Sequence, residues 1–302
     1  MGWTPRSGAG RSLLNMHSAK RSRGGLKYLK LHVLGVHSPF PGPDGASLGY
    51  LVEENGRGIL LDCGTGIYAR VAEKGWMGKL SAIILSHFHP DHSADIFPFS
   101  FAAFHAVRTG LRPGPLPLYI PPGERPTLES LIDGFGGLHV YFREGLEIRE
   151  YAAGVPLLIG DLRIVPHPVS HTIPTYGFSL QGNGSGTLAY SGDSRDDPSL
   201  VKLAREADFF LCEAASTEPG TAGRYGHLTP SQAGRLAHEA ACRTLMLTHF
   251  FPGIDRRAWI KEAAAAYPGP ITAVEPGTTY EIRPPALPFP EVPFSTDPSS
   301  RG

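Results

Sequence analysis

The feature that most constrains the fold of this chain is the stretch SHFHPDH at residues 86–92. It follows the apolar run Leu80–Leu85, which predicts a short buried strand. The histidines therefore fall where a strand gives way to a loop, a position at which a rigid scaffold commonly presents catalytic groups. Imidazoles and a carboxylate at this spacing are typical ligands of zinc, manganese or iron. A polar loop with incidental histidines is the alternative, and the density of the cluster in a chain with 13 histidines disfavours it.

Four polar side chains further along the chain share this type of position, close to the end of a predicted strand or the start of a predicted helix. They are His171, Asp193, His227 and His249. Taken singly, each is more commonly an ordinary loop residue than a ligand, but the shared placement favours one common site. His167 competes with His171, because both lie in the same segment four residues apart.

Composition and charge limit the classes of function. The chain has 28 Lys and Arg residues and 28 Asp and Glu residues, so no global field would recruit nucleic acid. Its three widely spaced cysteines lack a C-x-x-C pair, which predicts buried thiols and a cytoplasmic location rather than a disulfide framework. No stretch approaches the roughly 20 apolar residues that span a membrane, so no membrane partner is expected.

One domain is expected at residues 27–283. A basic segment at residues 1–26 is predicted to be a disordered tail, and a Pro-rich segment at residues 284–302 a second tail. No apolar core follows the basic residues of the first segment, so a secretory signal is not expected.

The order of the predicted elements indicates two sheets packed together with helices outside, because strands come first and then alternate with helices in each half. Strands are predicted at 27–35, 47–53, 58–62, 80–85, 116–120, 139–142, 146–151, 162–169, 174–181, 187–191, 208–213, 244–248 and 271–274. Helices are predicted at 67–74, from 93, at 127–134, at 198–206, from 229 and at 255–266.

These motifs resemble the metallo-β-lactamase superfamily. SHFHPDH at 86–92 matches its H-x-H-x-D-H motif, and LLDCG at 60–64, SGDS at 191–194 and LTHF at 247–250 match in the same order. The resemblance covers roughly residues 28–280. It implies an α/β fold, a four-layer αβ/βα sandwich with a two-metal site at the edge between the sheets.

Three further motifs narrow the resemblance to the ribonuclease Z and cyclic-phosphodiesterase-like branch: HTIPTYGF at 171–178, CEA at 212–214 and GHLTPSQAGRLA at 226–237. In bacterial ribonuclease Z, the arm that grips tRNA lies between the positions that match His171 and Asp193. In this sequence the interval holds only two predicted strands around a turn at 182–186. The chain therefore looks more similar to the members of this branch that lack the tRNA-binding arm.

The resemblance implies two divalent metal ions, Zn²⁺ or alternatively Mn²⁺. In this assignment the first ion is held by His87, His89 and His171, the second by Asp91, His92 and His249, and Asp193 bridges the two. A carboxylate suits the bridging position because it has two oxygens.

The resemblance also assigns catalytic roles to three residues. Asp91 would orient or deprotonate the water between the metals, His227 would protonate the leaving oxygen, and Glu213 would orient His227. The expected function is hydrolysis of a small or cyclic phosphodiester by attack of a metal-bridging hydroxide. A homodimer is a further expectation from the resemblance.

Two other activities are alternatives on the same residues. A ribonuclease Z-like endonuclease would process tRNA 3′ ends, but the short interval before Asp193 and the zero net charge disfavour an RNA partner. An aryl sulfatase or thioesterase is disfavoured by Glu213 and His227, which resemble a device for a phosphodiester leaving group. A metal-binding module without activity is disfavoured because every expected ligand is present.

Overall fold

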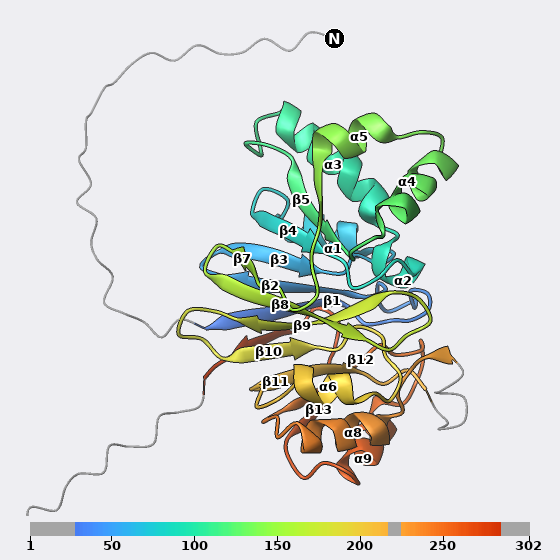
Figure 1. Cartoon of the computed structure of the whole chain (residues 1–302), viewed down its shortest axis with the longest axis vertical. Helices are drawn as coiled ribbons and strands as arrows, with labels where there is room; N and C mark the ends of the chain where they lie inside the picture. The colour runs from blue at the N-terminus through green and yellow to red at the C-terminus, as the bar shows by residue number, and fades with distance from the viewer. Residues whose placement is uncertain (1–27, 217–224, 285–302) are drawn as a thin grey trace, which may run out of the picture.

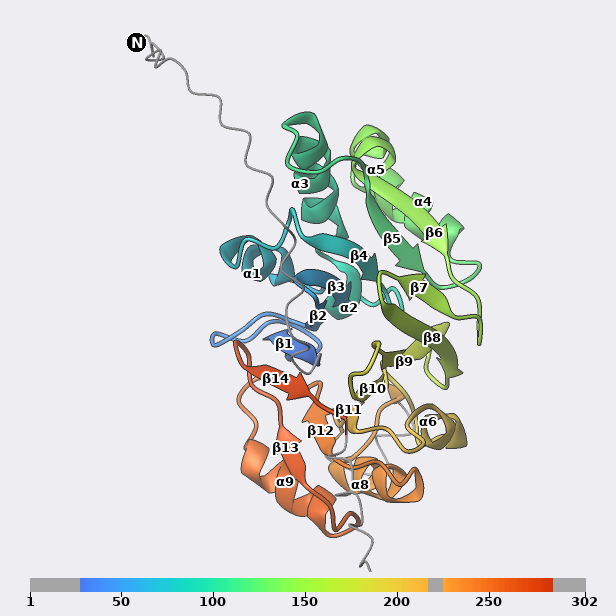
Figure 2. The ribbon, with the colours of Figure 1, turned by 90° about the vertical axis from the view of Figure 1, so that its left-hand side faces the viewer.

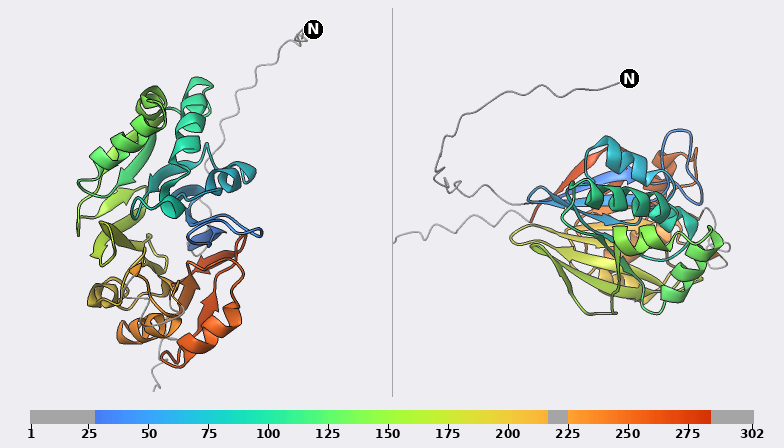
Figure 3. Two further views of the ribbon diagram at one scale, coloured as in Figure 1. Left: turned by 90° about the vertical axis from the view of Figure 1, so that its right-hand side faces the viewer. Right: turned by 90° about the horizontal axis from the view of Figure 1, so that it is seen from above.

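Two seven-stranded sheets form the centre of the fold, and the computed structural model describes residues 28–216 and 225–284. Helices cover the outer face of each sheet (Figure 1). Figures 2 and 3 show the same layering from three other directions. This arrangement confirms the predicted four-layer αβ/βα sandwich. The predicted tail at 1–26 lies outside the described residues. So does the predicted tail at 284–302, except for its first residue.

The first sheet is antiparallel on one side and parallel on the other. In spatial order its strands are β14 (Thr279–Ile282), β1 (Leu29–Gly35), β2 (Gly49–Glu54), β3 (Arg57–Leu61), β4 (Leu80–Ile84), β5 (Leu116–Ile120) and β6 (Leu146–Glu150). The strands from β14 to β3 pair antiparallel, and those from β3 to β6 pair parallel.

The second sheet repeats this plan. Its strands are β13 (Ile271–Ala273), β12 (Leu245–Thr248), β11 (Phe209–Glu213), β10 (Thr187–Tyr190), β9 (Thr175–Gln181), β8 (Leu162–Val169) and β7 (Leu157–Ile159). The strands from β7 to β10 pair antiparallel, and those from β10 to β13 pair parallel. Each sheet therefore has parallel strands whose carboxyl ends can present side chains at one edge.

The helices belong to two separate layers (Figure 1). Outside the first sheet lie α1 (Ile67–Glu73), α3 (Ile96–Arg108), α4 (Arg125–Gly134) and α5 (His139–Gly145). Outside the second lie α6 (Pro198–Leu203), α8 (Pro230–Glu239) and α9 (Arg256–Ala264). The short helix α2 (Pro90–Ser93) follows β4. None of the described helices is long and apolar enough to cross a membrane.

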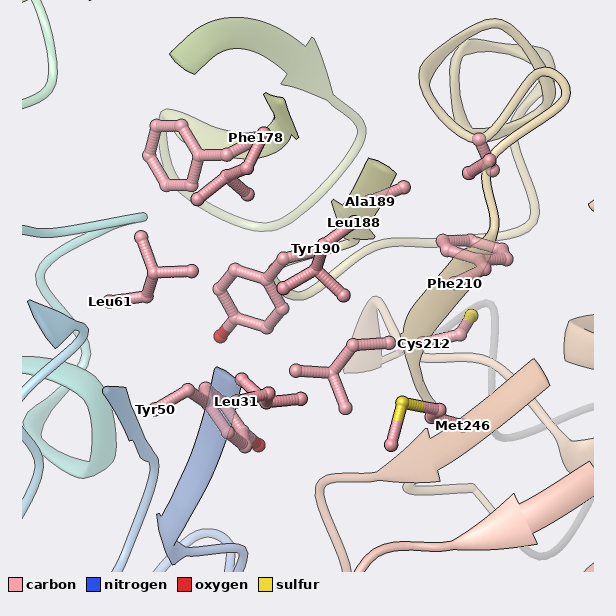
Figure 4. Packing of buried hydrophobic residues seen from close by; sticks show 14 of the residues in the cluster. Leu31, Tyr50, Leu61, Phe178, Leu188, Ala189, Tyr190, Phe210, Cys212 and Met246 are labelled. Atoms are coloured by element: carbon pink, nitrogen blue, oxygen red, sulfur yellow. The ribbon is translucent and has the colours of Figure 1, made fainter. Parts of the chain in front are cut away.

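The main core lies between the two sheets. Residues of β1 alternate, so Leu31 is fully buried in this core whereas His32 lies on the opposite face. Figure 4 shows Tyr190 of β10 reaching toward Leu31 and Tyr50 of the first sheet. The Tyr50 and Tyr190 rings lie 5.2 Å apart. This packing fixes the relative position of the two sheets and of the loops that follow their strands.

One predicted strand is wrong. Residues 139–142 begin the helix α5 rather than a strand. In a helix Leu138 and Phe142 lie on one face, and both pack into the core under the first sheet. A short apolar run fits both the 3.6-residue period of a helix and the 2-residue period of a strand, so the sequence pattern alone does not separate the two here.

The cysteine prediction is confirmed, because all three thiols are free and buried. Burial raises the pKa of the Cys63 and Cys212 thiols well above the usual value. It also raises the pKa of Cys242 to about 11.

Phe178 tests the packing between the sheets. Its side chain is fully buried and its ring meets that of Tyr151 edge-on at 5.6 Å. We expect Phe178→Ala to lower the free energy of unfolding by about 3–5 kcal/mol, because it leaves a cavity. The matched control is Phe135→Ala, at a side chain that is 63% exposed, with an expected effect of about 0.5 kcal/mol. Equal midpoints for the two variants in urea unfolding would contradict this view of the core.

Candidate metal centre

The predicted ligands come from loops that meet at one edge of the sandwich. Strand β4 leads into residues 86–92, β10 into Asp193 and β12 into His249, and the loop between β8 and β9 carries His171. Three overlapping groups have ligand atoms within 4.8 Å of one another: His87, His89, His171 and Asp193; Asp91, His92 and His249; and Asp193, His227 and His249. The fold therefore brings all seven predicted ligands into one cluster.

Backbone hydrogen bonds hold the histidine loop against the first sheet. The amide of Cys63 donates to the carbonyl of His92 at 2.7 Å, and the amide of Leu48 donates to the carbonyl of Asp91 at 3.0 Å. Gly64 permits this approach, because a Cβ there would lie 1.8 Å from the Asp91 carbonyl oxygen. The glycine of the LLDCG motif thus has a specific steric role.

The first group converges on His89. Its Nδ1 lies 3.1 Å from His87 Nε2 and 3.2 Å from His171 Nε2. His171 Nδ1 lies 2.8 Å from the Gly226 carbonyl oxygen, which can only accept, so Nδ1 carries the proton. In the neutral ring, Nε2 then directs a lone pair into the cluster. Burial favours this neutral form, because it lowers the pKa of His171, His89 and, most strongly, His87.

The second group has Asp91, His92 and His249. His92 Nε2 and His249 Nε2 are 3.3 Å apart, and Asp91 Oδ2 lies 3.8 Å from the first and 3.7 Å from the second. His249 adopts a left-handed backbone with φ of 66°, an uncommon conformation outside glycine. The backbone is held there because the next residue, Phe250, donates its amide to the Val36 carbonyl at 2.8 Å.

Asp193 lies between the two groups. Its Oδ1 is 3.1 Å from His92 Nε2 and 3.0 Å from His249 Nε2, whereas its Oδ2 is 3.6 Å from His87 Nε2. Despite this proximity, the buried Oδ1 has no partner aligned as a hydrogen-bond donor. One oxygen thus faces each group, which is the geometry expected of a carboxylate shared by two cations.

The charge balance of the cluster favours a cation. Burial lowers the pKa of His92, but Asp193, Asp91 and Asp62 outweigh burial and raise the pKa well above its usual value. His92 Nδ1 is committed to the Asp62 carboxylate at 2.8 Å. The carboxylates therefore favour positive charge at Nε2, and a divalent cation can supply that charge in place of a proton. The residues present fit a divalent metal site.

His227 borders the cluster and is paired with a buried carboxylate. Its Nδ1 lies 3.0 Å from Glu213 Oε1, which leaves Nε2 for the cavity that His227 lines. Burial lowers the pKa of His227, but the charge of Glu213 and the hydrogen bond to it outweigh burial and raise that pKa to about 9. Glu213 is itself held by the amides of Ser194 at 2.8 Å and Leu228 at 3.2 Å. This pair can hold and deliver a proton.

Sequence reasoning missed two residues that support the cluster. Asp62 accepts hydrogen bonds from His92 and from Ser86, and Ser38 Oγ donates to Asp91 Oδ2 at 2.7 Å. Asp62 shares the signal of the other site residues, a polar group at a strand end. Ser38 has no such signal, because its contact depends on two loops far apart in the sequence. His167 lies outside the cluster and contacts Ser179 Oγ at 3.0 Å.

The cluster opens into a cavity of about 910 Å³. The described residues that line it are Ser38, Pro39, His89, Pro90, Asp91, Thr172, Asp193, Ala215, Ser216, Tyr225, His227 and Phe251. A cavity of this size accommodates a small organic ligand beside the cluster.

Known proteins are similar to this chain in sequence and in fold. The β-lactamase superfamily domain model matches residues 57–250. An uncharacterized protein of Mycobacterium leprae is 33% identical over 85% of this chain and 90% of its own length. A ribonuclease Z of Mycobacterium bovis is 29% identical over 80% of this chain and 94% of its own.

A solved structure extends the likeness to three dimensions. The metallo-β-lactamase fold protein YhfI of Bacillus subtilis superposes with a TM-score of 0.76 at 27% identity, over 84% of this chain and 99% of that protein. The match to the domain model covers most of the chain and includes the histidine loop and His249. The chain therefore belongs to the β-lactamase superfamily, as a metal-dependent hydrolase with the metallo-β-lactamase fold.

Proposed function

We propose that this chain hydrolyses small phosphodiesters with the help of two divalent metal ions. The observation that carries the proposal is the Glu213–His227 pair beside the ligand cluster, in which His227 lines the cavity and Glu213 holds it from the buried side. A proton donor in that position suits a reaction in which an alkoxide oxygen must leave. The free, buried thiols also fit a cytoplasmic location.

In this proposal each of the two groups of candidate ligands holds one metal ion. One ion is assigned to His87, His89 and His171, the other to Asp91, His92 and His249, and Asp193 is shared. The number of imidazoles favours Zn²⁺, with Mn²⁺ as the alternative. Bound there, the ions would activate water and neutralise charge that develops on the phosphodiester.

The protein groups around the cluster have separate tasks in this proposal. His227 delivers its Nε2 proton to the leaving oxygen, while Glu213 fixes the ring and keeps it protonated near neutral pH. Asp91 borders the cavity with its carboxylate held by the Ser38 hydroxyl, and it orients the attacking water. In this proposal His227 acts on the leaving oxygen, at the P–O bond that breaks, and Asp91 acts on the attacking water, at the P–O bond that forms.

The surroundings favour a small substrate over tRNA. The interval between His171 and Asp193 is occupied by β9, β10 and the short turn between them. The described lining of the cavity contains neither lysine nor arginine, which a site for a polyanion would require. The ribonuclease Z of Mycobacterium bovis, at 29% identity, supports RNA 3′ processing as the second candidate.

A substrate panel tests the proposal. Protein loaded with Zn²⁺ or Mn²⁺ is expected to hydrolyse bis(p-nitrophenyl) phosphate and a cyclic nucleotide. His227→Ala is expected to lower kcat for the cyclic nucleotide by about 10²–10⁴-fold, because its alkoxide leaving group needs the proton donor, and to affect the aryl diester much less. Metal content measured on the same samples should not change. The matched control is His167→Ala, at a histidine outside the cluster, with unchanged kcat.

Other outcomes of this panel would reject the proposal. Cleavage of precursor tRNA without turnover of either small diester would establish the RNA candidate instead. Turnover of p-nitrophenyl sulfate or a thioester alone would assign a different hydrolase reaction to the same residues. A His227→Ala variant with full activity on the cyclic nucleotide would remove the proton donor from the mechanism.

The pH profile tests the role of Glu213. A general acid must be protonated, so activity falls as pH rises through its pKa. Burial lowers the pKa of His227 and the Glu213 carboxylate raises it, so Glu213→Gln should move the alkaline limb of the kcat profile to lower pH. Steady-state kinetics from pH 6 to 10 measure this limb. An alkaline limb at the same pH in both proteins would show that His227 is not the titrating acid.

A further inference from the structure

An aromatic pair lies at the edge of the cavity, beside the cluster of candidate ligands. The rings of Phe40 and Phe251 meet edge-on, with centroids 5.3 Å apart at 77°. Phe40 is 49% exposed and Phe251 is 51% exposed, and Phe251 lines the cavity. Two adjoining, half-exposed phenylalanines leave apolar surface in water, which is informative when it borders a ligand site.

The two loops that carry these rings are joined to each other. The Ser38 amide donates to the Phe250 carbonyl at 3.0 Å, and the Phe250 amide donates to the Val36 carbonyl at 2.8 Å. Residues 36–40 and 249–251 therefore form one unit. The aromatic pair does not rest on a single free loop.

This unit is also hydrogen-bonded to the cluster of candidate ligands. Ser38 Oγ holds Asp91 Oδ2 at 2.7 Å, and His249 immediately precedes Phe250 and Phe251 in the chain. The distance between the aromatic pair and the cluster is thus set by short, hydrogen-bonded segments. A ligand group that stacks on Phe251 would be placed at a fixed offset from the reacting phosphodiester.

Among the described residues, the lining beyond the cluster has no cationic side chain that would attract additional negative charge. Its carboxylates and imidazoles are those of His89, Asp91, Asp193 and His227, all at the cluster, and the described lining holds no lysine or arginine. A phenyl ring binds through its face and carries no hydrogen-bonding group. The cavity therefore suits an uncharged, planar group attached to a single phosphodiester.

We propose that Phe251, supported by Phe40, forms a subsite for a planar aromatic group of the substrate, either a nucleobase or an aryl ester group. The inference rests on the proposed phosphodiesterase function and narrows its substrate class. Stacking tolerates different bases, because every base has an aromatic face. The subsite should therefore select for the presence of an aromatic group and only weakly for its identity.

Steady-state kinetics with paired substrates test the subsite. Adenosine 3′,5′-cyclic phosphate is compared with methyl ribofuranoside 3′,5′-cyclic phosphate, which lacks the base, and bis(p-nitrophenyl) phosphate provides the aryl arm. We expect Phe251→Ala to raise KM for the base-containing diester by about 10-fold, with little change for the diester without a base. Phe251→Tyr keeps a stacking face and should restore KM.

The matched control is Phe135→Ala, because Phe135 is also an exposed phenylalanine, at 63%, in contact with a second phenylalanine ring. Its partner is Phe97, in the helical layer outside the first sheet. It should leave both KM values unchanged. An effect of Phe251→Ala on bis(p-nitrophenyl) phosphate alone would assign the subsite to aryl groups, and an effect on the nucleotide alone would assign it to nucleobases. Equal effects on the substrates with and without an aromatic group would overturn the proposal.

A binding measurement separates this inference from the proposed function. On metal-loaded protein, adenosine 5′-monophosphate is expected to bind about 10-fold more tightly than ribose 5-phosphate, with Phe251→Ala removing the difference. If no phosphodiester is hydrolysed, the proposed function fails, yet this ratio still decides whether the aromatic subsite exists. Equal affinities of the two ligands for the unmodified chain would refute the subsite.

Discussion

The carboxylate of Asp62 is the constraint on which the site depends. It is fully buried, and a buried charge is costly unless its hydrogen bonds are satisfied. Asp62 Oδ2 accepts from His92 Nδ1 at 2.8 Å, from Ser86 Oγ at 2.9 Å and from the Tyr190 hydroxyl at 2.6 Å. Two of these donors flank the histidine loop and the third comes from the opposite sheet. One carboxylate therefore orients a cluster histidine and joins the sheets behind the cluster.

Each sheet supplies part of the cluster, so the proposed chemistry depends on how the two sheets pack. The loop after β4 brings His87, His89, Asp91 and His92 from the first sheet, and loops of the second sheet bring His171, Asp193 and His249. The cation site is complete only when the sheets are packed in one register, because Asp193 must lie within reach of both groups. The same edge holds Glu213 and His227, so the proposed proton donor shares one cavity with the proposed cation site.

Much of this arrangement followed from local sequence patterns, and the exceptions depend on long-range contacts. Mostly apolar runs such as Leu80–Leu85 indicate the strands, and polar residues at strand ends indicate the cluster. The pattern of residues 139–142 fits a strand as well as the helix that they form, because a run this short matches both the period of 2 and the period of 3.6 residues. Strands β7 and β14 were not predicted: β7 has only three residues, and β14 depends on its pairing with β1 across the length of the chain. The Ser38–Asp91 contact was missed for the same reason.

The central claim is that the converging imidazoles and carboxylates hold two cations that share Asp193. Metal content per chain, measured by inductively coupled plasma mass spectrometry after saturation with Zn²⁺ and removal of excess, tests it most directly. We predict about two ions in the unmodified chain and about one in each of His171→Ala and His249→Ala, because each of these variants removes a ligand from a different group. A content near zero in the unmodified chain, or the same content in all three proteins, would contradict the claim.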